Sequence, residues 1–295
     1  KWLVEMNKFL RLYCAHINPA VGDFKGNFEK IALHINSAKE HSADIIAFPE
    51  LAITGYPPED LLLKPSFIEE NLKYLGKIAG LSENIIVIIG FVNKENEIFN
   101  SAAILNDKKL ISVYNKQYLP NYSVFDEERY FQKGSSGYIY NINDTLFGIN
   151  ICEDIYYSSG PLQYQAVLGG ASLIINISAS PYHIGKIEER EKLLYTRAVD
   201  NRVNILYVNL VGGQDELVFD GCSMLVNEKG RILYRAKPFE EDYFLFDLDM
   251  QELCSLRLMD AKYKNLRAQM QKLYKPIPEI KIKTNNKKSF ENRGE

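Results

Sequence analysis

Cysteine and histidine are scarce in this sequence, which has four of each among 295 residues. The cysteines, Cys14, Cys152, Cys222 and Cys254, are widely spaced and include no C-x-x-C pair. Such spacing does not suit a disulfide framework, and it is typical of free thiols in a reducing compartment. The sequence contains no cluster of metal ligands. We therefore expect a cytoplasmic protein without a metal site.

Long apolar runs and an excess of basic residues are also missing. No segment approaches the roughly 20 apolar residues that a membrane span requires, and residues 85–92, the longest candidate, have the length of a buried strand. Residues 1–6 do not resemble a secretory signal, because their apolar stretch is short and a charge interrupts it. The formal net charge of -3 disfavours a nucleic-acid surface, which needs a basic excess. We expect neither a membrane nor a nucleic-acid partner.

Glycine-rich phosphate loops are absent as well. The sequence has no G-x-x-x-x-G-K or G-x-G-x-x-G motif and no Ser-Gly-Gly loop. Its nearest glycine-rich stretch, at residues 212–215, lacks the phosphate-binding pattern. Nucleotide chemistry is therefore not expected from the residues of this chain.

What the chain does contain is a regular succession of apolar and amphipathic segments. Strands are predicted at residues 9–17, 44–48, 84–92, 98–114 (two strands around a turn at 106–108), 137–142, 146–152, 172–177, 205–211, 221–226, 232–236 and 244–248. Helices are predicted at residues 27–41, 67–81, 163–169 and 188–201.

The connections between these segments indicate the fold class. Some neighbouring strands are joined by short polar turns and others by helices, which predicts an α/β fold with mixed sheets and helices outside. We find no internal repeat and expect one folded domain over residues 1–273. Residues 274–295 are polar and begin with Pro276 and Pro278, so we expect a linker or a disordered tail there.

Three predicted strands end in chemically useful residues. Cys152 follows an apolar run and precedes a turn, Glu50 follows the strand at 44–48, and Lys116 follows the strand that ends near residue 114. The carboxyl ends of strands are where α/β folds place their chemistry, so these residues make a nucleophile, a base and an electrophilic group. Taken singly, each residue has a plainer interpretation. Cys152 could be a small buried side chain, Glu50 an acid at the start of a helix, and Lys116 a solvated surface charge.

Longer motifs around these residues resemble the nitrilase superfamily of carbon–nitrogen hydrolases, and within it the glutaminase domain of glutamine-dependent NAD synthetases. The resemblance runs from about residue 12 to residue 248 and is carried by NPAVGD at 18–23, FPELAITGYPPEDL at 48–61, KQYLPNYSVFDEERYF at 116–131, ICED at 151–154, NISASPY at 176–182 with GK at 185–186, and VGGQDELVFDG at 211–221. It implies a four-layer α-β-β-α sandwich and a homo-oligomer that pairs through helices.

The resemblance also implies roles for single residues. Glu50 would be the general base, Lys116 the stabiliser of the transition state, and Cys152 the nucleophile whose pKa a nearby ammonium lowers. Glu127 would orient the lysine, and the backbone N–H of Glu153 would share the oxyanion hole. The positions that match the lining of the glutamine pocket are Tyr56, Tyr122, Phe125, Ser180 and Lys186.

Some of these assignments have alternatives. Tyr122 and Phe125 could instead pack in the core, and Ser180, which precedes Pro181, could be a turn residue. Lys186 stands where relatives can carry arginine, so it supplies a cation without the bidentate fork.

The function implied is a glutamine amidohydrolase that releases ammonia through a Cys152 thioester, for the amidation step of NAD synthesis. This reaction needs no cofactor. ATP and Mg²⁺ would belong to a synthetase domain that this sequence lacks and that would be a partner in cis or in trans. Two alternatives stay open: a free-standing hydrolase of another small amide, and a non-catalytic regulatory module that retains the fold.

Overall fold

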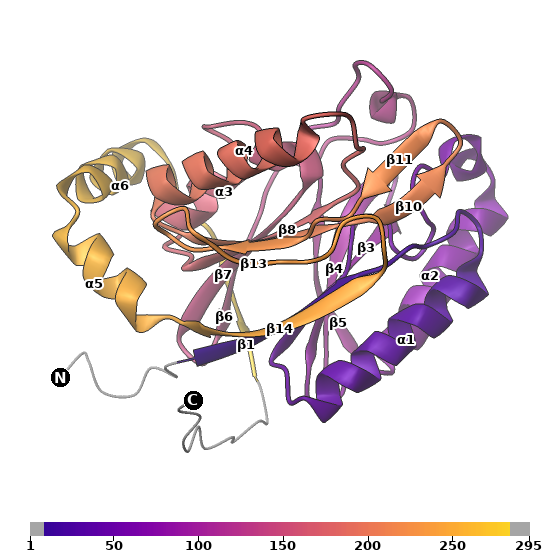
Figure 1. Ribbon diagram of the computed structural model, residues 1–295, viewed down its shortest axis with the longest axis horizontal. Coiled ribbons are helices and arrows are strands. Elements are labelled where there is room, and N and C mark those ends of the chain that lie inside the picture. The colour runs from indigo at the N-terminus through magenta and orange to yellow at the C-terminus, as the bar shows by residue number, and fades with distance from the viewer. Residues whose placement is uncertain (1–8, 284–295) are drawn as a thin grey trace.

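Two β-sheets stacked face to face form the centre of the computed structural model, which describes residues 9–283 (Figure 1). The first is a six-stranded mixed sheet with parallel pairs at β1–β2 and β2–β3. In spatial order its strands are β14 (Asp242–Asp249), β1 (Phe9–His16), β2 (Ile45–Ala47), β3 (Ile86–Lys94), β4 (Ile98–Asn106) and β5 (Lys109–Asn115).

The second sheet has seven strands and is also mixed. Its parallel pairs, β7–β8, β8–β9 and β6–β15, combine with antiparallel partners at the other positions. In spatial order its strands are β13 (Ile232–Arg235), β12 (Met224–Val226), β9 (Asn204–Asn209), β8 (Leu173–Ser178), β7 (Thr145–Ile151), β6 (Ile139–Ile142) and β15 (Glu279–Ile282).

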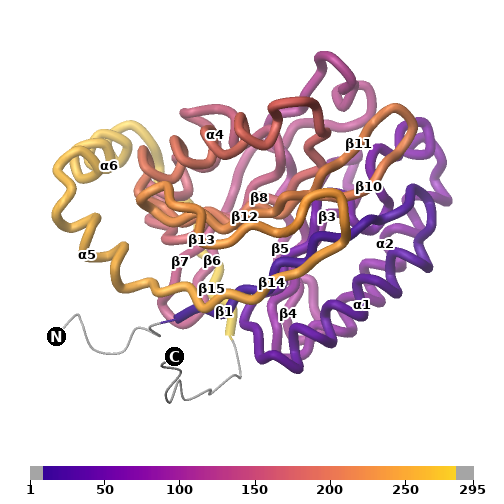
Figure 2. Tube along the Cα trace, viewed as in Figure 1, coloured from indigo at the N-terminus to yellow at the C-terminus, as the bar shows by residue number. Residues whose placement is uncertain are grey.

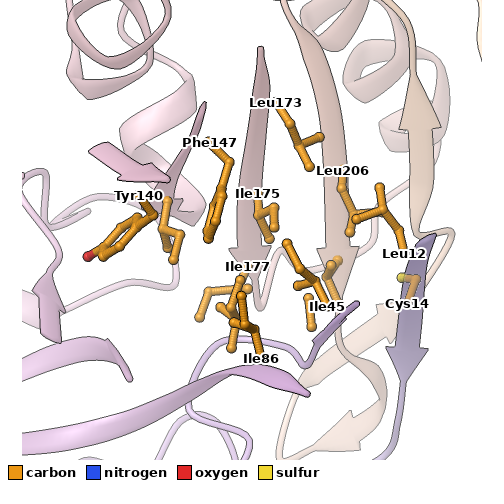
Figure 3. Packing of buried hydrophobic residues seen from close by; sticks show 14 of the residues in the cluster. Leu12, Cys14, Ile45, Ile86, Tyr140, Phe147, Leu173, Ile175, Ile177 and Leu206 are labelled. Carbon is orange, nitrogen blue, oxygen red and sulfur yellow. The ribbon is translucent and has the colours of Figure 1, made fainter. Parts of the chain in front are cut away.

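The main hydrophobic core lies between the two sheets. Figure 3 shows side chains of both sheets meeting there, with Ile45 and Ile86 from the first sheet opposite Ile175 and Ile177 from the second. Because successive strand residues point to opposite faces, Val87 packs on the outer side, in the cluster that includes the covering helices. Strands that are covered on both faces need continuous apolar sequences, which explains the apolar run of β2 and that of residues 86–92 in β3.

Helices cover the two outer faces and complete four layers (Figure 1). Helices α1 (Phe24–Glu40) and α2 (Pro65–Ala79) pack on the six-stranded sheet, and the first helix begins where the Asp23 carboxylate accepts a hydrogen bond from the N–H of Gly26 at 2.9 Å. The seven-stranded sheet is covered by α3 (Pro161–Gln163) with the following π-helical turn Tyr164–Leu168, α4 (Lys186–Asn201) and α6 (Ala261–Leu273). The predicted α-β-β-α sandwich is confirmed.

The structure corrects the predicted end of the domain. Residues 279–282, which we assigned to a linker or disordered tail, form strand β15 and pair in parallel with β6. Ile282 is buried in the inter-sheet core, so this short alternating segment adds apolar surface to the fold. Helices α5 (Gln251–Met259) and α6 were not predicted. Residues 284–295 of the predicted tail lie outside the described residues.

The strand predicted at residues 205–211 ends at Asn209, and the chain then forms a separate hairpin. Its strands are β10 (Val211–Gln214) and β11 (Leu217–Asp220). The hairpin lies near the loops of the first sheet (Figure 2), where the ring of Phe219 packs edge-on against Tyr56 at 6.0 Å between centroids. It thereby covers one side of the region into which the strand ends project.

Between residues 9 and 283, no helix combines the length and the apolar character needed to cross a membrane.

Candidate active site

The three strand ends singled out from the sequence meet at one buried place. Glu50 follows β2, Lys116 follows β5, and Cys152 follows β7, so the first two come from the six-stranded sheet and the third from the seven-stranded sheet. Lys116 and Glu50 are buried and form an ion pair at 2.7 Å between Nζ and Oε1. The charges of both residues act on the Cys152 thiol.

A glycine in the neighbouring strand allows Glu50 to take its position. A Cβ atom at Gly90 of β3 would lie 2.2 Å from the backbone nitrogen of Leu51 and 2.6 Å from the carbonyl carbon of Glu50. Leu51 itself has a left-handed backbone with φ of 46°. The chain at Glu50 and Leu51 therefore turns tightly against β3 at Gly90, where no side chain is present. This turn directs Glu50 into the site.

The Glu50 carboxylate is held from three directions. Oε1 accepts hydrogen bonds from Lys116 and from the side-chain amide of Asn100, each at 2.7 Å. Oε2 accepts one from the backbone N–H of Ala179 at 2.8 Å, at the end of β8 in the other sheet. These bonds fix the orientation of the carboxylate.

Lys116 lies between two carboxylates. Its Nζ is 2.7 Å from Glu50 and 2.9 Å from both oxygens of Glu127. Burial opposes the charge, but the charges of Glu127 and Glu50 outweigh it and hold the pKa of Lys116 well above its usual range. The side chain is therefore a permanent ammonium that can stabilise an oxyanion.

Glu127 is the second partner of this lysine, as the sequence suggested. Burial raises its pKa to about 7, while Lys116 acts in the opposite direction. The hydroxyl of Tyr56 donates a hydrogen bond to Glu127 Oε1 at 3.0 Å. Tyr56, expected to line the glutamine pocket, is thus placed behind the Lys116–Glu127 pair.

Cys152 occupies a strained position at the bottom of a cavity. Its φ is 41°, a left-handed value that bulky residues rarely adopt, and its side chain is buried. Burial and the charge of Glu50 raise the pKa of the thiol well above its usual range, although Lys116 lowers it. Lys116 does act in the expected direction, but burial and the charge of Glu50 outweigh it, so the resting thiol needs a base to ionise.

The cavity above Cys152 has a volume of about 290 Å³. Its lining brings together four of the five predicted substrate-binding residues with the nucleophile and the residue after it. These are Tyr122, Phe125, Ser180, Lys186, Cys152 and Glu153, joined by Tyr156, Tyr182, His183 and other residues.

Opposite charges line this cavity. The Glu153 carboxylate accepts hydrogen bonds from the hydroxyl of the half-exposed Tyr122 at 2.9 and 3.1 Å. The Lys186 ammonium lies 5.5 Å from the centre of the Tyr156 ring and 3.8 Å from the exposed carboxylate of Glu189. A small ligand that carries both an ammonium and a carboxylate finds a counter-charge for each.

Several residues that support the site were not predicted from the sequence. The side-chain amide of Asn100 holds Glu50 in place. The only feature of the sequence that could have indicated this role is the position of Asn100 in β4, next to the strand that precedes Lys116. Arg190 and Asp220 form a bidentate ion pair at 3.0 and 3.1 Å that is completely buried behind Ser180. Their separation of thirty positions in the chain hides this contact from sequence inspection.

Asp154 was also overlooked, although it lies in the ICED motif. It is fully buried and accepts hydrogen bonds from both sides of the site, as described below.

Among residues 9–283, no group of three or more histidine, cysteine, aspartate or glutamate side chains could hold a metal ion.

Comparisons with known proteins identify the family of the chain. Residues 13–258 match the carbon–nitrogen hydrolase family model. The chain is 42% identical over 264 residues to a glutamine-dependent NAD(+) synthetase of Thermotoga maritima, covering 89% of this chain and 46% of that protein. It is 45% identical over 257 residues to the Aquifex aeolicus protein of the same name, covering 86% and 45%. The chain thus spans about half the length of the curated relatives it matches.

Solved structures show the same fold. The glutamine-dependent NAD+ synthetase of Acinetobacter baumannii, in complex with ADP, superposes with a TM-score of 0.80 and 37% identity, covering 83% of this chain and 47% of that one. An amidase of the nitrilase superfamily from Nesterenkonia superposes with a TM-score of 0.77 at 21% identity, covering 92% and 99%. The chain described here belongs to the carbon–nitrogen hydrolase family, within the nitrilase superfamily.

Proposed function

We propose that this chain is a glutamine amidohydrolase, which releases ammonia from L-glutamine through a thioester on Cys152. The observation that carries the proposal is the buried Lys116 between Glu50 and Glu127, whose charges act on the thiol of Cys152 in the lining of a small charged cavity. A base, an oxyanion stabiliser and a nucleophile are the groups that acyl transfer from an amide requires.

The reaction proceeds in two halves. Glu50 takes the thiol proton of Cys152 while the sulfur attacks the side-chain carbonyl carbon of glutamine, and the oxyanion is held by Lys116 and the backbone N–H of Glu153. Glu50 then gives the proton to the departing nitrogen, the C–N bond breaks, and ammonia leaves a thioester. In the second half Glu50 takes a proton from water, the hydroxide attacks the thioester carbon, and the proton returns to Cys152 as glutamate leaves. Loss of one of the hydrogen-bond donors to the oxyanion would raise the activation free energy by about 3–4 kcal/mol.

The cavity supports glutamine as the substrate. Lys186 and the Ser180 hydroxyl can bind the α-carboxylate, and the Glu153 carboxylate can bind the α-ammonium. An amide without these charged groups would leave the counter-charges of the cavity unused, which disfavours a general small-amide hydrolase.

The ammonia would serve the amidation step of NAD synthesis. This follows from the names of the relatives and from the share of their length, about 46%, that the chain matches. The remaining half of the enzyme would be a synthetase domain in cis or in trans, where ATP and Mg²⁺ would act. We also propose a homo-oligomer and, because the four cysteines are free thiols, a cytoplasmic location.

Ammonia release from a set of amides tests the choice of substrate. L-glutamine should be hydrolysed with kcat/KM at least about 10²-fold above glutaramate, which lacks the α-ammonium, because an unpaired charge in the cavity costs more than 2 kcal/mol. Lys186→Met should raise KM for glutamine by about 10- to 100-fold, and Lys186→Arg should restore most of the affinity. Equal rates for glutamine and glutaramate would favour the hydrolase of another small amide. No thioester with any amide would favour a non-catalytic module.

A further inference from the structure

A second buried carboxylate, Asp154, lies two residues after the nucleophile and takes no part in the chemistry proposed above. Its Oδ2 accepts hydrogen bonds from the hydroxyl of Tyr114 at 2.7 Å and from the N–H of Ile151 at 3.0 Å. Its Oδ1 accepts from the N–H groups of Gln117 and Tyr118 at 3.1 and 2.9 Å. Both oxygens are therefore used in full by the protein itself.

The donors come from the two different sheets. Ile151 is the last residue of β7 in the seven-stranded sheet and immediately precedes Cys152. Gln117 follows Lys116 just beyond the end of β5 in the six-stranded sheet. One carboxylate thus joins the chain beside the nucleophile to the chain beside the oxyanion stabiliser.

This arrangement is unfavourable for the charge itself. Burial raises the pKa of Asp154 to about 6, although the hydrogen bonds from Ile151 and Tyr114 act in the opposite direction. A neutral side chain would avoid this desolvation, but an amide has a single acceptor oxygen. It could accept from Tyr114 and Ile151 or from Gln117 and Tyr118, but not from all four donors. The geometry therefore requires a carboxylate at this position.

We propose that Asp154 is a positioning residue, which sets the distance between the Lys116 ammonium and the Cys152 thiol by joining the two sheets at the site. The proposal rests on the proposed function in one respect, that both groups act on the same carbonyl. Each catalytic group is anchored in its own sheet, so a small shift of one sheet against the other separates them. A displacement of 1 Å in an active site can cost about 10²-fold in rate.

The variant Asp154→Asn tests this role. The amide oxygen can face either Tyr114 and Ile151 or Gln117 and Tyr118, and the NH₂ group then faces at least one backbone N–H donor of the other pair. We expect kcat for glutamine to fall about 10²-fold. KM should stay within about two-fold, because the groups that bind the ends of the substrate lie elsewhere in the cavity.

Alkylation of Cys152 by iodoacetamide as a function of pH gives a readout that does not need glutamine. Lys116 lowers the pKa of the thiol, so its displacement in Asp154→Asn should move the alkylation midpoint to higher pH. Wild-type protein that is alkylated but does not hydrolyse glutamine would contradict the proposed function and leave this comparison intact. An unchanged midpoint together with unchanged kcat would overturn the role of Asp154.

A milder pair of variants covers the case in which Asp154→Asn does not fold. Tyr114→Phe removes one of the hydrogen bonds to Asp154 and should lower kcat by about 3- to 10-fold. Its urea midpoint should fall, but the protein should remain folded in the assay buffer. Tyr140→Phe is the matched control: it removes the hydroxyl of another buried tyrosine, which contacts Ser112 at 3.2 Å, and should keep kcat within about two-fold. Equal kcat in the two variants, or losses that follow the unfolded fraction, would contradict the proposal.

Discussion

At the scale of single residues, the site contains two carboxylates and one ammonium with almost no access to water. Glu50, Lys116 and Glu127 are each buried, so their charges are stabilised by one another and by fixed hydrogen bonds. Burial, followed by the charge of Glu50, raises the pKa of the Cys152 thiol well above its usual range. In the mechanism that we propose, Glu50 must therefore remove the thiol proton, because the thiol is not permanently ionised.

The raised pKa of Glu127 predicts a pH dependence of stability. A carboxyl group with a folded-state pKa of about 7 binds its proton more tightly than in the unfolded chain, so its contribution to stability is present at pH 5 and is lost as pH rises through 7. Relative to Glu127→Gln, the wild type should lose up to about 3 kcal/mol between pH 5 and pH 8. Urea unfolding of both proteins at pH 5, 6.5 and 8 measures this difference. A gain of relative stability with rising pH would contradict the assignment.

At the scale of elements, the ends of β2 and β3 must approach each other closely. Gly90→Ala would place a Cβ atom 2.2 Å from the backbone nitrogen of Leu51, and backbone cannot yield as a flexible side chain can. We expect a loss of about 1–3 kcal/mol in the free energy of unfolding and a fall in kcat, because Glu50 moves with the turn.

The matched control for this prediction is Gly76→Ala in helix α2, where an added Cβ meets no atom within 4 Å. It should stabilise the protein by about 0.5–1 kcal/mol and leave kcat unchanged. Equal stability of the two alanine variants would contradict the prediction that the close contact at Gly90 excludes a side chain there.

The C-terminal strand is a second feature at this scale. Ile282 in β15 is buried in the core between the sheets, and the adjacent Lys281 is exposed. We expect Ile282→Ala to cost about 2–4 kcal/mol and Lys281→Ala less than about 0.5 kcal/mol, measured by urea unfolding. If the two variants are equally stable, residues 279–282 do not contribute to the folded core.

At the scale of the whole molecule, the sequence predicted what depends on local pattern. The continuous apolar runs identified the strands of both sheets, and the motifs located Glu50, Lys116 and Cys152 at their ends. Strand β15 was not predicted, because a segment of four residues after two prolines is too short to show a clear hydrophobic periodicity.

Long-range contacts explain what else was missed. Tyr56 reaches Glu127 across 71 positions, and Asp154 reaches Tyr114 across 40, so no spacing rule reveals either pair. The effect of burial on the pKa of Cys152 was not predicted for the same reason, since burial follows from the packing of two sheets rather than from neighbouring residues.

The central claim is that Cys152 is the nucleophile of a formed glutamine pocket. Intact-mass spectrometry after exposure to the glutamine analogue 6-diazo-5-oxo-norleucine tests it most directly, with Cys152→Ala as the control. We predict one stoichiometric adduct on the wild type, none on the variant, and protection by excess glutamine. A wild-type protein whose Cys152 reacts with iodoacetamide but not with the analogue would contradict the claim.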